Sequence, residues 1–236
     1  MNASVRRLTE ADWSAVGEAL DRDGFATLPP LLDGGECRRL RDCFDDDALF
    51  RSTVDMARFN FGQGTYRYFA YPLPAGVRAL REALYPPLAR IANTWAERLG
   101  QPADWPSSLA GLTELCHREG QTRPTPLLLR YRADDYNCLH QDLYGPIHFP
   151  LQVIVLLSEP GRDFTGGELV LVEQRPRMQS RPMVVPLTLG AAAVIPVKER
   201  PRLGTRGHHR VQMRHGVSRV RSGSRITLGV IFHDAR

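Results

Sequence analysis

Two histidines and an aspartate have the residue types and the spacing that could hold a metal ion. His140 and Asp142 stand two positions apart in NCLHQDLY, so on an extended backbone both side chains leave one face and can converge on an ion. His215, far along the chain, is the candidate third ligand. An H-x-D triplet alone also occurs in exposed polar loops, so the argument depends on that third residue. Two histidines and one carboxylate leave other coordination positions open, which suits Fe(II) that must bind further reactants.

Arg225 is the next candidate, because it comes ten residues after His215 and opens the apolar run RITLGVIF. A guanidinium that enters an apolar interior is costly unless an anion meets it. A dicarboxylate co-substrate bound at the metal would supply that anion. The alternative is a solvated arginine at a strand edge, since this part of the chain is rich in arginine.

Other histidines compete with His215 for the third position. His208 and His209 are adjacent, so on a strand they would face opposite sides and one of them could point inward. We prefer His215 because Arg225 follows it at the expected distance. The remaining histidines are expected in loops or at strand ends, hydrogen-bonded and without a metal: His117, His148 and His233.

Short apolar runs from residue 126 onward are the elements that must position these side chains. Gly, Pro and polar clusters separate the runs, and many short strands with turn signals between them indicate a jelly roll or a similar double sheet. Opposite strands of such a fold bring distant positions together, as a site with His215 beside His140 requires. The runs are LLLRY, LQVIVLL, ELVLV, MVVPL, AAAVIP and ITLGVIF.

The front of the chain has helical periodicity instead. We predict a helix over 9–23 with Thr9 as its N-cap, a second helix after Asp33, and a long helix over 79–99. The expected fold class is therefore β-rich α+β, with a double-stranded β-helix (jelly-roll) core and an N-terminal helical layer.

Length and composition fit one soluble domain. A chain of 236 residues suits a single core, so we expect one domain over 1–236, with a helical support region at 1–120 and the jelly-roll core at 121–236. No stretch resembles a secretory leader or reaches the roughly 18 apolar residues of a membrane span, so we expect a cytoplasmic protein. The cysteines form no CxxC pair and are expected to be reduced thiols.

Positive charge gathers in the last third of the chain. The net charge is +5, and between Gln174 and Arg236 thirteen Arg or Lys residues face two acids. A basic face of this kind attracts polyanions through phosphate contacts and counterion release. Nearly every one of these residues is Arg, so genome composition is an alternative explanation.

The pattern of H-x-D, a distal histidine and an arginine about ten residues beyond resembles the Fe(II)/2-oxoglutarate-dependent oxygenase superfamily. The resemblance covers residues 126–234, and GFATLPPLL is similar to the strand that commonly opens these proteins. It implies that the metal is held by His140, Asp142 and His215. It also implies that Arg225 pairs with the C5 carboxylate of 2-oxoglutarate and that Tyr131 hydrogen-bonds the oxoacid; the alternative for Tyr131 is an ordinary barrel aromatic.

The activity implied by the resemblance is hydroxylation of a substrate C–H bond with Fe(II), 2-oxoglutarate and O₂, releasing succinate and CO₂. The metal and co-substrate carry the reactive chemistry, so no catalytic residue beyond the metal ligands is implied. When the hydroxylated carbon is a methyl group on nitrogen, it leaves as formaldehyde and the outcome is demethylation.

RHGVSRVRSGSRITLGVIFHDA and TGGELVLVEQRPR resemble a bacterial branch proposed to demethylate damaged nucleic-acid bases, which implies a role in DNA repair. The basic stretch 198–221 agrees with a nucleic-acid partner. One departure is Ile231, which stands where AlkB-type demethylases usually carry a second arginine. The candidate substrate residues are Tyr66, Tyr68, Tyr144 and Arg210, with ordinary core or lid aromatics as the alternative for the tyrosines.

Two other functions remain open on the sequence. The H-x-D motif and the glycine-led strands fit a prolyl-hydroxylase-like peptidyl or small-molecule hydroxylase equally well. A jelly-roll protein that binds a metal or nucleic acid without turnover is the alternative from another class. It would have no need of Arg225, so that residue separates it from an oxygenase.

Overall fold

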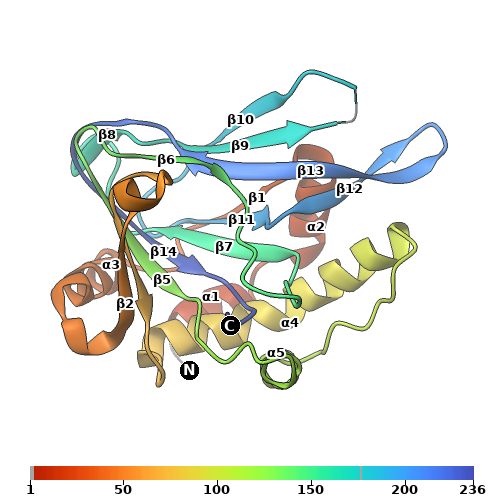
Figure 1. The fold of residues 1–236 in the computed structure, drawn as a ribbon, viewed down its shortest axis with the longest axis horizontal. Helices are drawn as coiled ribbons and strands as arrows, with labels where there is room; N and C mark the ends of the chain where they lie inside the picture. Colours follow the sequence, from red (N-terminus) through yellow and green to blue (C-terminus); the bar gives the residue numbers. More distant parts are fainter. Residues whose placement is uncertain (1–2, 176) are drawn as a thin grey trace.

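Two antiparallel sheets face each other in the computed structural model, which describes residues 3–175 and 177–236 (Figure 1). The larger sheet has the order β1 (Ala26–Leu28), β11 (Ala192–Pro196), β7 (Leu151–Leu156), β14 (Val220–Val230), β5 (Leu127–Arg132), β4 (Thr65–Phe69) and β2 (Phe50–Asp55), with β8 (Phe164–Gly166) paired to β14. The smaller sheet has the order β10 (Arg181–Val185), β9 (Leu169–Gln174), β13 (Gly207–Val217), β6 (Tyr136–His140) and β3 (Gly62–Gln63), with β12 (Glu199–Gly204) paired to β13. This is the predicted β-rich jelly roll.

The predicted apolar runs form strands, as their patterning requires. Strand β7 is almost entirely buried, because helices cover one of its faces and the smaller sheet covers the other. Strand β9 instead alternates, burying Leu169, Leu171 and Glu173 and turning the residues between them outward. Strands β6, β12 and β13 were not among the predicted runs, because their polar residues hide the alternation.

The main core lies between the larger sheet and the helix α4 (Ala75–Arg98), which runs along the sheet face away from the smaller sheet (Figure 1). Tyr85 of α4 packs against Phe149 and Phe232, with ring centroids 5.1 and 5.8 Å away. Aromatic packing of this kind buries large apolar areas and makes a firm base for the strands above it. A shorter helix, α5 (Leu109–Arg118), packs beside α4.

The predicted first helix, over 9–23, is α2 (Trp13–Asp23), but it begins later than predicted, its predicted cap is wrong, and another helix, α1 (Ala3–Thr9), precedes it. Thr9 is the last residue of α1, and α2 begins after Asp12. The Asp12 carboxylate accepts hydrogen bonds from the N–H groups of Ser14 (3.0 Å) and Ala15 (3.1 Å), so it satisfies donors that helix formation leaves free. The second predicted helix is α3 (Gly34–Asp42), which Asp33 caps together with Glu36.

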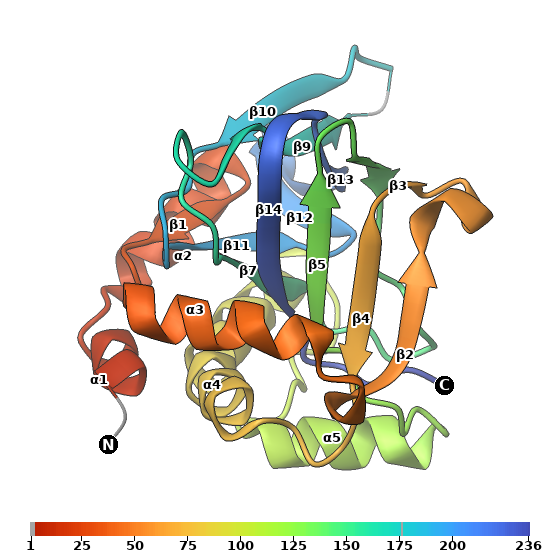
Figure 2. The ribbon, with the colours of Figure 1, turned by 90° about the vertical axis from the view of Figure 1, so that its left-hand side faces the viewer.

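Residues 1–120 are not only helical. Between α3 and α4 the chain makes the 3-10 turns η1 (Cys43–Asp45), η2 (Asp47–Leu49) and η3 (Met56–Phe59) and the strands β2, β3 and β4. The segment TYRYF is rich in aromatic residues and pairs as β4 with β5, so the front of the chain extends the larger sheet (Figure 2). This places Tyr66 and Tyr68 in the barrel. No helix among the described residues is long and apolar enough to cross a membrane.

Candidate metal centre

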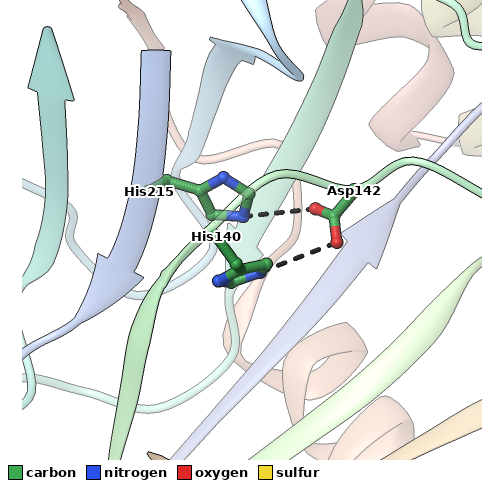
Figure 3. Close-up of side chains that lie close together, drawn as sticks. All are labelled: His140, Asp142 and His215. Carbon is green, nitrogen blue, oxygen red and sulfur yellow. Dashed lines mark ion pairs between the residues drawn. The ribbon is translucent and has the colours of Figure 1, made fainter. Parts of the chain in front are cut away.

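His140, Asp142 and His215 converge between the two sheets (Figure 3). His140 is the last residue of β6, Asp142 follows in the loop to β7, and His215 lies on β13 directly opposite His140 in the strand register. Their ligand atoms all lie within 4.8 Å of one another. Asp142 Oδ2 is 3.2 Å from Nε2 of His215, and Asp142 Oδ1 is 3.6 Å from Nε2 of His140. The structure thus brings the three predicted ligands together, and they form the one such cluster found in the part of the chain described.

The protonation of these groups fits a divalent metal. Burial alone would raise the pKa of Asp142, but His140, His215 and a hydrogen bond from Tyr144 lower it below its usual range. Burial, helped by His215, lowers the pKa of His140. Nδ1 of His140 lies 2.8 Å from the Cys138 carbonyl oxygen, so an Nδ1–H tautomer leaves the Nε2 lone pair free for a metal. An ionised carboxylate and neutral imidazoles are the donors that Fe(II) takes in such sites.

Both oxygens of the Asp142 carboxylate are held by neighbouring side chains. The Tyr144 hydroxyl donates to Oδ1 at 2.7 Å, and Gln152 Nε2 donates to Oδ2 at 2.8 Å. Tyr68 in turn donates to the Tyr144 hydroxyl at 3.0 Å. Sequence reasoning missed Gln152, although one signal was present: it is the polar residue inside the apolar run LQVIVLL. These bonds fix the direction in which Asp142 offers its oxygens.

Replacing Tyr144 with phenylalanine should weaken Fe(II) binding about 10- to 100-fold, because the carboxylate loses one of the two donors that orient it. Anaerobic equilibrium titration with Fe(II) would measure this. Tyr136→Phe is the matched control, because Tyr136 is an exposed tyrosine of β6 that lies outside the cavity lining. Equal affinities for the two variants would mean that Gln152 alone is enough to hold Asp142.

Arg225 lines the same cavity, and no acidic side chain of the described residues lies within ion-pair distance of it. Its side chain is 2% exposed, with the guanidinium 5.6 Å from the Tyr131 ring centroid and 6.0 Å from that of Phe164. Its Nε and Nη1 atoms are buried without a hydrogen-bond partner among the described residues. Burial lowers the pKa of Arg225 to about 10, while Tyr131 and Glu168 act in the opposite direction. A buried cation with free donors fits a carboxylate ligand, since leaving it unpaired is costly.

Tyr131 lies beside Arg225 and is fully buried. Its hydroxyl accepts a hydrogen bond from Asn137 Nδ2 at 3.1 Å, and its ring lines the cavity. Asn137 was not among the predicted residues, although it stands three positions before His140 on β6. This end of the cavity, named the anion end for the free donors of Arg225, therefore combines an arginine with a tyrosine that an amide orients.

A cavity of about 300 Å³ joins the metal cluster to the anion end. The predicted substrate tyrosines Tyr66, Tyr68 and Tyr144 line it, but Arg210 does not. Arg210 points outward from β13 and forms an ion pair with Glu199 at 3.2 Å. The structure therefore brings the tyrosines to the site and leaves Arg210 outside it.

Part of the basic stretch 198–221 turns inward and does not add to an exposed cationic face. Arg200 is fully buried and pairs with Glu173 at 2.5 Å, and its Nη1 donates to the Asp21 carbonyl at the end of α2. Arg202 also pairs with Glu173, at 2.9 Å. A count of charges along the chain cannot tell which arginines turn inward; Arg206, Arg214 and Arg221 of the same stretch remain exposed. Strands β12 and β13 also project as a hairpin away from α3 and β2 (Figure 1).

The other histidines lie outside the cluster. His208 and His209, one of which could have pointed inward, are both exposed on the β12–β13 hairpin. His117, expected in a loop or at a strand end, lies instead in helix α5 and contacts the Asp234 carboxylate at 3.2 Å. His233 is buried and accepts a hydrogen bond from the Phe149 N–H at 3.2 Å.

Comparisons with known proteins agree with this geometry. Residues 64–235 match the model of the Oxygenase-NA family, described as an oxygenase catalysing oxidative methylation of damaged DNA. Uncharacterized proteins of two Mycobacterium tuberculosis strains, CDC 1551 and H37Rv, are 49% identical to this chain over 167 residues, 71% of this chain and 72% of theirs.

Solved structures share the fold at low sequence identity. A prolyl-4-hydroxylase of Pseudomonas putida is similar with a TM-score of 0.54 and 13% identity, over 95% of this chain and 100% of that one. A 2OG-Fe(II) oxygenase family oxidoreductase of Burkholderia pseudomallei gives a TM-score of 0.56 and 18% identity, over 96% and 95% of the chains. These likenesses extend over nearly the whole chain, so they include the helices as well as the jelly roll.

Proposed function

The chain belongs to the Oxygenase-NA family of Fe(II)- and 2-oxoglutarate-dependent oxygenases, and from that premise we propose that it oxidatively demethylates damaged bases in nucleic acid. We propose His140, Asp142 and His215 as the iron ligands and Arg225 as the anchor of 2-oxoglutarate. The observation that carries the assignment of residues is that the metal cluster and an unpaired buried arginine share one cavity.

When bound, Fe(II) and 2-oxoglutarate use O₂ to oxidise a C–H bond of the substrate, with release of succinate and CO₂. The family description speaks of oxidative methylation, but oxidation of an N-methyl group removes it. Insertion of oxygen into a methyl C–H bond gives N–CH₂OH, whose C–N bond breaks to release formaldehyde and return the N–H. Demethylation is therefore the outcome that this chemistry supports.

The chain's own residues orient the metal ligands, bind the co-substrate carboxylate and enclose the reacting groups. Asp142 is kept ionised and aimed by Tyr144 and Gln152, so the ligand set is formed before substrate enters. The Arg225 guanidinium offers donors to a carboxylate where water has little access, and such charge-assisted bonds are stronger there than in solvent. The buried cavity also limits side reactions of the oxidising centre with solvent.

Aromatic rings on the other side of the cavity favour a planar substrate. Tyr66 and Tyr68 meet edge to face at 5.4 Å, and Tyr68 meets Tyr144 at 6.0 Å. Phe61 lines the cavity yet is 47% exposed, and it stacks on Phe59 at 5.6 Å. Nucleobases that leave the helical stack are held by such rings, because every base has a π face. Exposed phenylalanines at a catalytic cavity therefore support a nucleobase substrate.

A demethylation assay tests this proposal. Iron-loaded protein with 2-oxoglutarate and a single-stranded oligonucleotide carrying an N-methylated base should release formaldehyde and succinate in equal amounts. Phe61→Ala should raise KM for the oligonucleotide by about tenfold, since stacking on one aromatic residue is worth about 1–3 kcal/mol. Leu203→Ala, which removes an exposed apolar side chain from the distant hairpin, should leave KM unchanged.

The same assay separates the alternatives. Hydroxylation of proline in test peptides, with no formaldehyde from any methylated oligonucleotide, would favour a peptidyl hydroxylase and reject base demethylation. A substrate-stimulated conversion of 2-oxoglutarate that Phe61→Ala does not affect would keep the oxygenase but remove the stacking role.

A further inference from the structure

Arg51 lies against the outer side of a tyrosine that walls the catalytic cavity. Its guanidinium carbon is 4.5 Å from the centroid of the Tyr68 ring, and its Nε donates to the Pro124 carbonyl at 2.9 Å. Tyr68 lines the cavity whereas Arg51 does not. The ring contact and the hydrogen bond fix the guanidinium plane, and no hydrogen bond among the described residues uses the terminal nitrogens.

A second arginine adjoins the first. Arg123 immediately precedes Pro124, the residue that accepts the hydrogen bond of Arg51, and its backbone is tied to Ala235 by bonds of 2.9 and 2.8 Å. The Arg123 side chain is exposed. Burial lowers the pKa of Arg51, and the neighbouring charge of Arg123 lowers it further, while Tyr68 and Asp234 oppose them. The hydrogen bond of Arg51 to Pro124 thus places the two arginines on neighbouring segments, where like charges repel each other unless an anion binds beside them.

No carboxylate neutralises this pair. Neither Arg51 nor Arg123 has an acidic group within ion-pair distance in the described part of the chain. The acid that influences Arg51, Asp234, is fully buried and already engaged. Its oxygens contact Arg81 at 2.8 Å, Tyr71 at 3.0 Å and His117 at 3.2 Å. The arginine pair is therefore left with free donors.

We propose that Arg51 and Arg123 form a subsite for the phosphate group next to the base that enters the cavity. The inference rests on the proposed function, because a target base inside the cavity leaves its sugar and phosphate outside. Arg51 lies on the outside of the Tyr68 wall, and Tyr68 is linked through the Tyr144 hydroxyl to Asp142. The terminal nitrogens of a guanidinium form an edge that matches phosphate geometry, and a second arginine on the neighbouring segment adds both affinity and register.

The two kinds of contact lie at opposite ends of β2. Arg51 is the second residue of β2, whereas Phe59 and Phe61 come after the strand ends at Asp55. Strand β2 lies at the edge of the larger sheet, beside β4 (Figure 2). A nucleic-acid strand would then place a phosphate at one end of β2 and a neighbouring base on the phenylalanines at the other.

The phosphate could belong to a free nucleotide or to a polynucleotide backbone, and binding measurements distinguish these sources. Anaerobic protein with Fe(II) and 2-oxoglutarate is titrated against a fluorescein-labelled methylated single-stranded oligonucleotide over a range of salt. N1-methyladenosine and its 5′-monophosphate then compete with the label. The variants are Arg51→Ala and Arg123→Ala, with Arg90→Ala as control because Arg90 is an exposed arginine of α4, the helix on the sheet face away from the smaller sheet.

We expect each variant to weaken oligonucleotide binding about tenfold, and to lower the magnitude of the salt slope by about 0.7, the value for one phosphate contact on a single strand. Arg90→Ala should change neither. If the monophosphate also outcompetes the nucleoside in the wild type alone, a free nucleotide suffices; if not, the backbone phosphodiester is required. Arg123 is exposed, so its variant gives a result even where Arg51→Ala disturbs folding.

Unchanged affinity and salt slope in both variants would overturn the subsite, whatever the enzyme does to the methyl group. Formaldehyde release from the same oligonucleotide reports separately on the proposed function. If the wild type releases formaldehyde but the variants bind the oligonucleotide normally, demethylation is supported and the subsite is rejected. If the variants bind more weakly but no formaldehyde is released, the phosphate subsite is supported and demethylation is rejected. Absence of oligonucleotide binding in the wild type rejects both.

Discussion

Replacing His215 with alanine should abolish turnover and lower Fe(II) affinity by more than the 100-fold or so that loss of a supporting hydrogen bond costs. With His140 and Asp142 alone, the cluster offers an ion two donors, and the histidine from the opposite strand no longer closes the site. The variant should still fold, because β13 is held to β6 and β9 by its backbone, which the substitution leaves in place.

The measurement is an anaerobic titration with Fe(II) and 2-oxoglutarate, followed by the visible charge-transfer band that chelation of the oxoacid to ferrous iron gives. His209→Ala is the matched control, because it removes an exposed histidine from the same strand without touching the cluster. A normal band in His215→Ala would mean that the metal is held elsewhere. Loss of the band in the control would show that hairpin stability, and not ligation, controls iron binding.

The core of the site could be predicted because its residues are few and chemically distinctive. A close histidine and aspartate, a distant histidine and an arginine at a fixed interval are visible without knowledge of which strands pair. Strands β7, β9 and β14 were visible for another reason, since their apolar runs are long and bounded by turn residues. In the structure the predicted site residues and residues of these strands line one cavity.

What the sequence did not show depends on contacts between distant segments. Gln152 and Asn137 are ordinary polar residues until strand pairing puts one against Asp142 and the other against Tyr131. The fate of Arg200 is similar, because its partner Glu173 lies on another strand and only tertiary packing decides that both point inward. Local patterns specify a strand and its faces, but they do not specify which distant side chain will meet them.

Replacing Arg225 with methionine should change stability and co-substrate binding in opposite directions. In the protein without 2-oxoglutarate, the guanidinium is buried with Nε and Nη1 unpaired, and unsatisfied buried groups cost about 1–3 kcal/mol. Methionine fills similar space without a charge, so the free protein should gain stability of that order. For a chain of this length the melting temperature should rise by several degrees, since each kcal/mol shifts it by about 2–4 °C.

Binding of 2-oxoglutarate should be lost at the same time. Truncating one partner of a buried charge pair costs about 2–5 kcal/mol, which corresponds to a rise of about 30-fold or more in the dissociation constant. With Fe(II) present throughout, the wild-type melting temperature should therefore increase on addition of 2-oxoglutarate, while that of Arg225→Met should show little response at the same concentration. Differential scanning calorimetry with and without 2-oxoglutarate measures both effects in one series.

Arg221→Met provides the control, because Arg221 lies on the same strand but is exposed to solvent. It should leave both the free stability and the ligand response as in the wild type. A lower melting temperature for free Arg225→Met would mean that the guanidinium already has a stabilising partner without the co-substrate. If the melting temperature of Arg225→Met still rises with 2-oxoglutarate, a residue other than Arg225 binds the carboxylate. If Arg225 serves to bind an incoming anion, its replacement makes the free protein more stable and removes the response to the ligand. If Arg225 instead has a structural role, its replacement makes the free protein less stable.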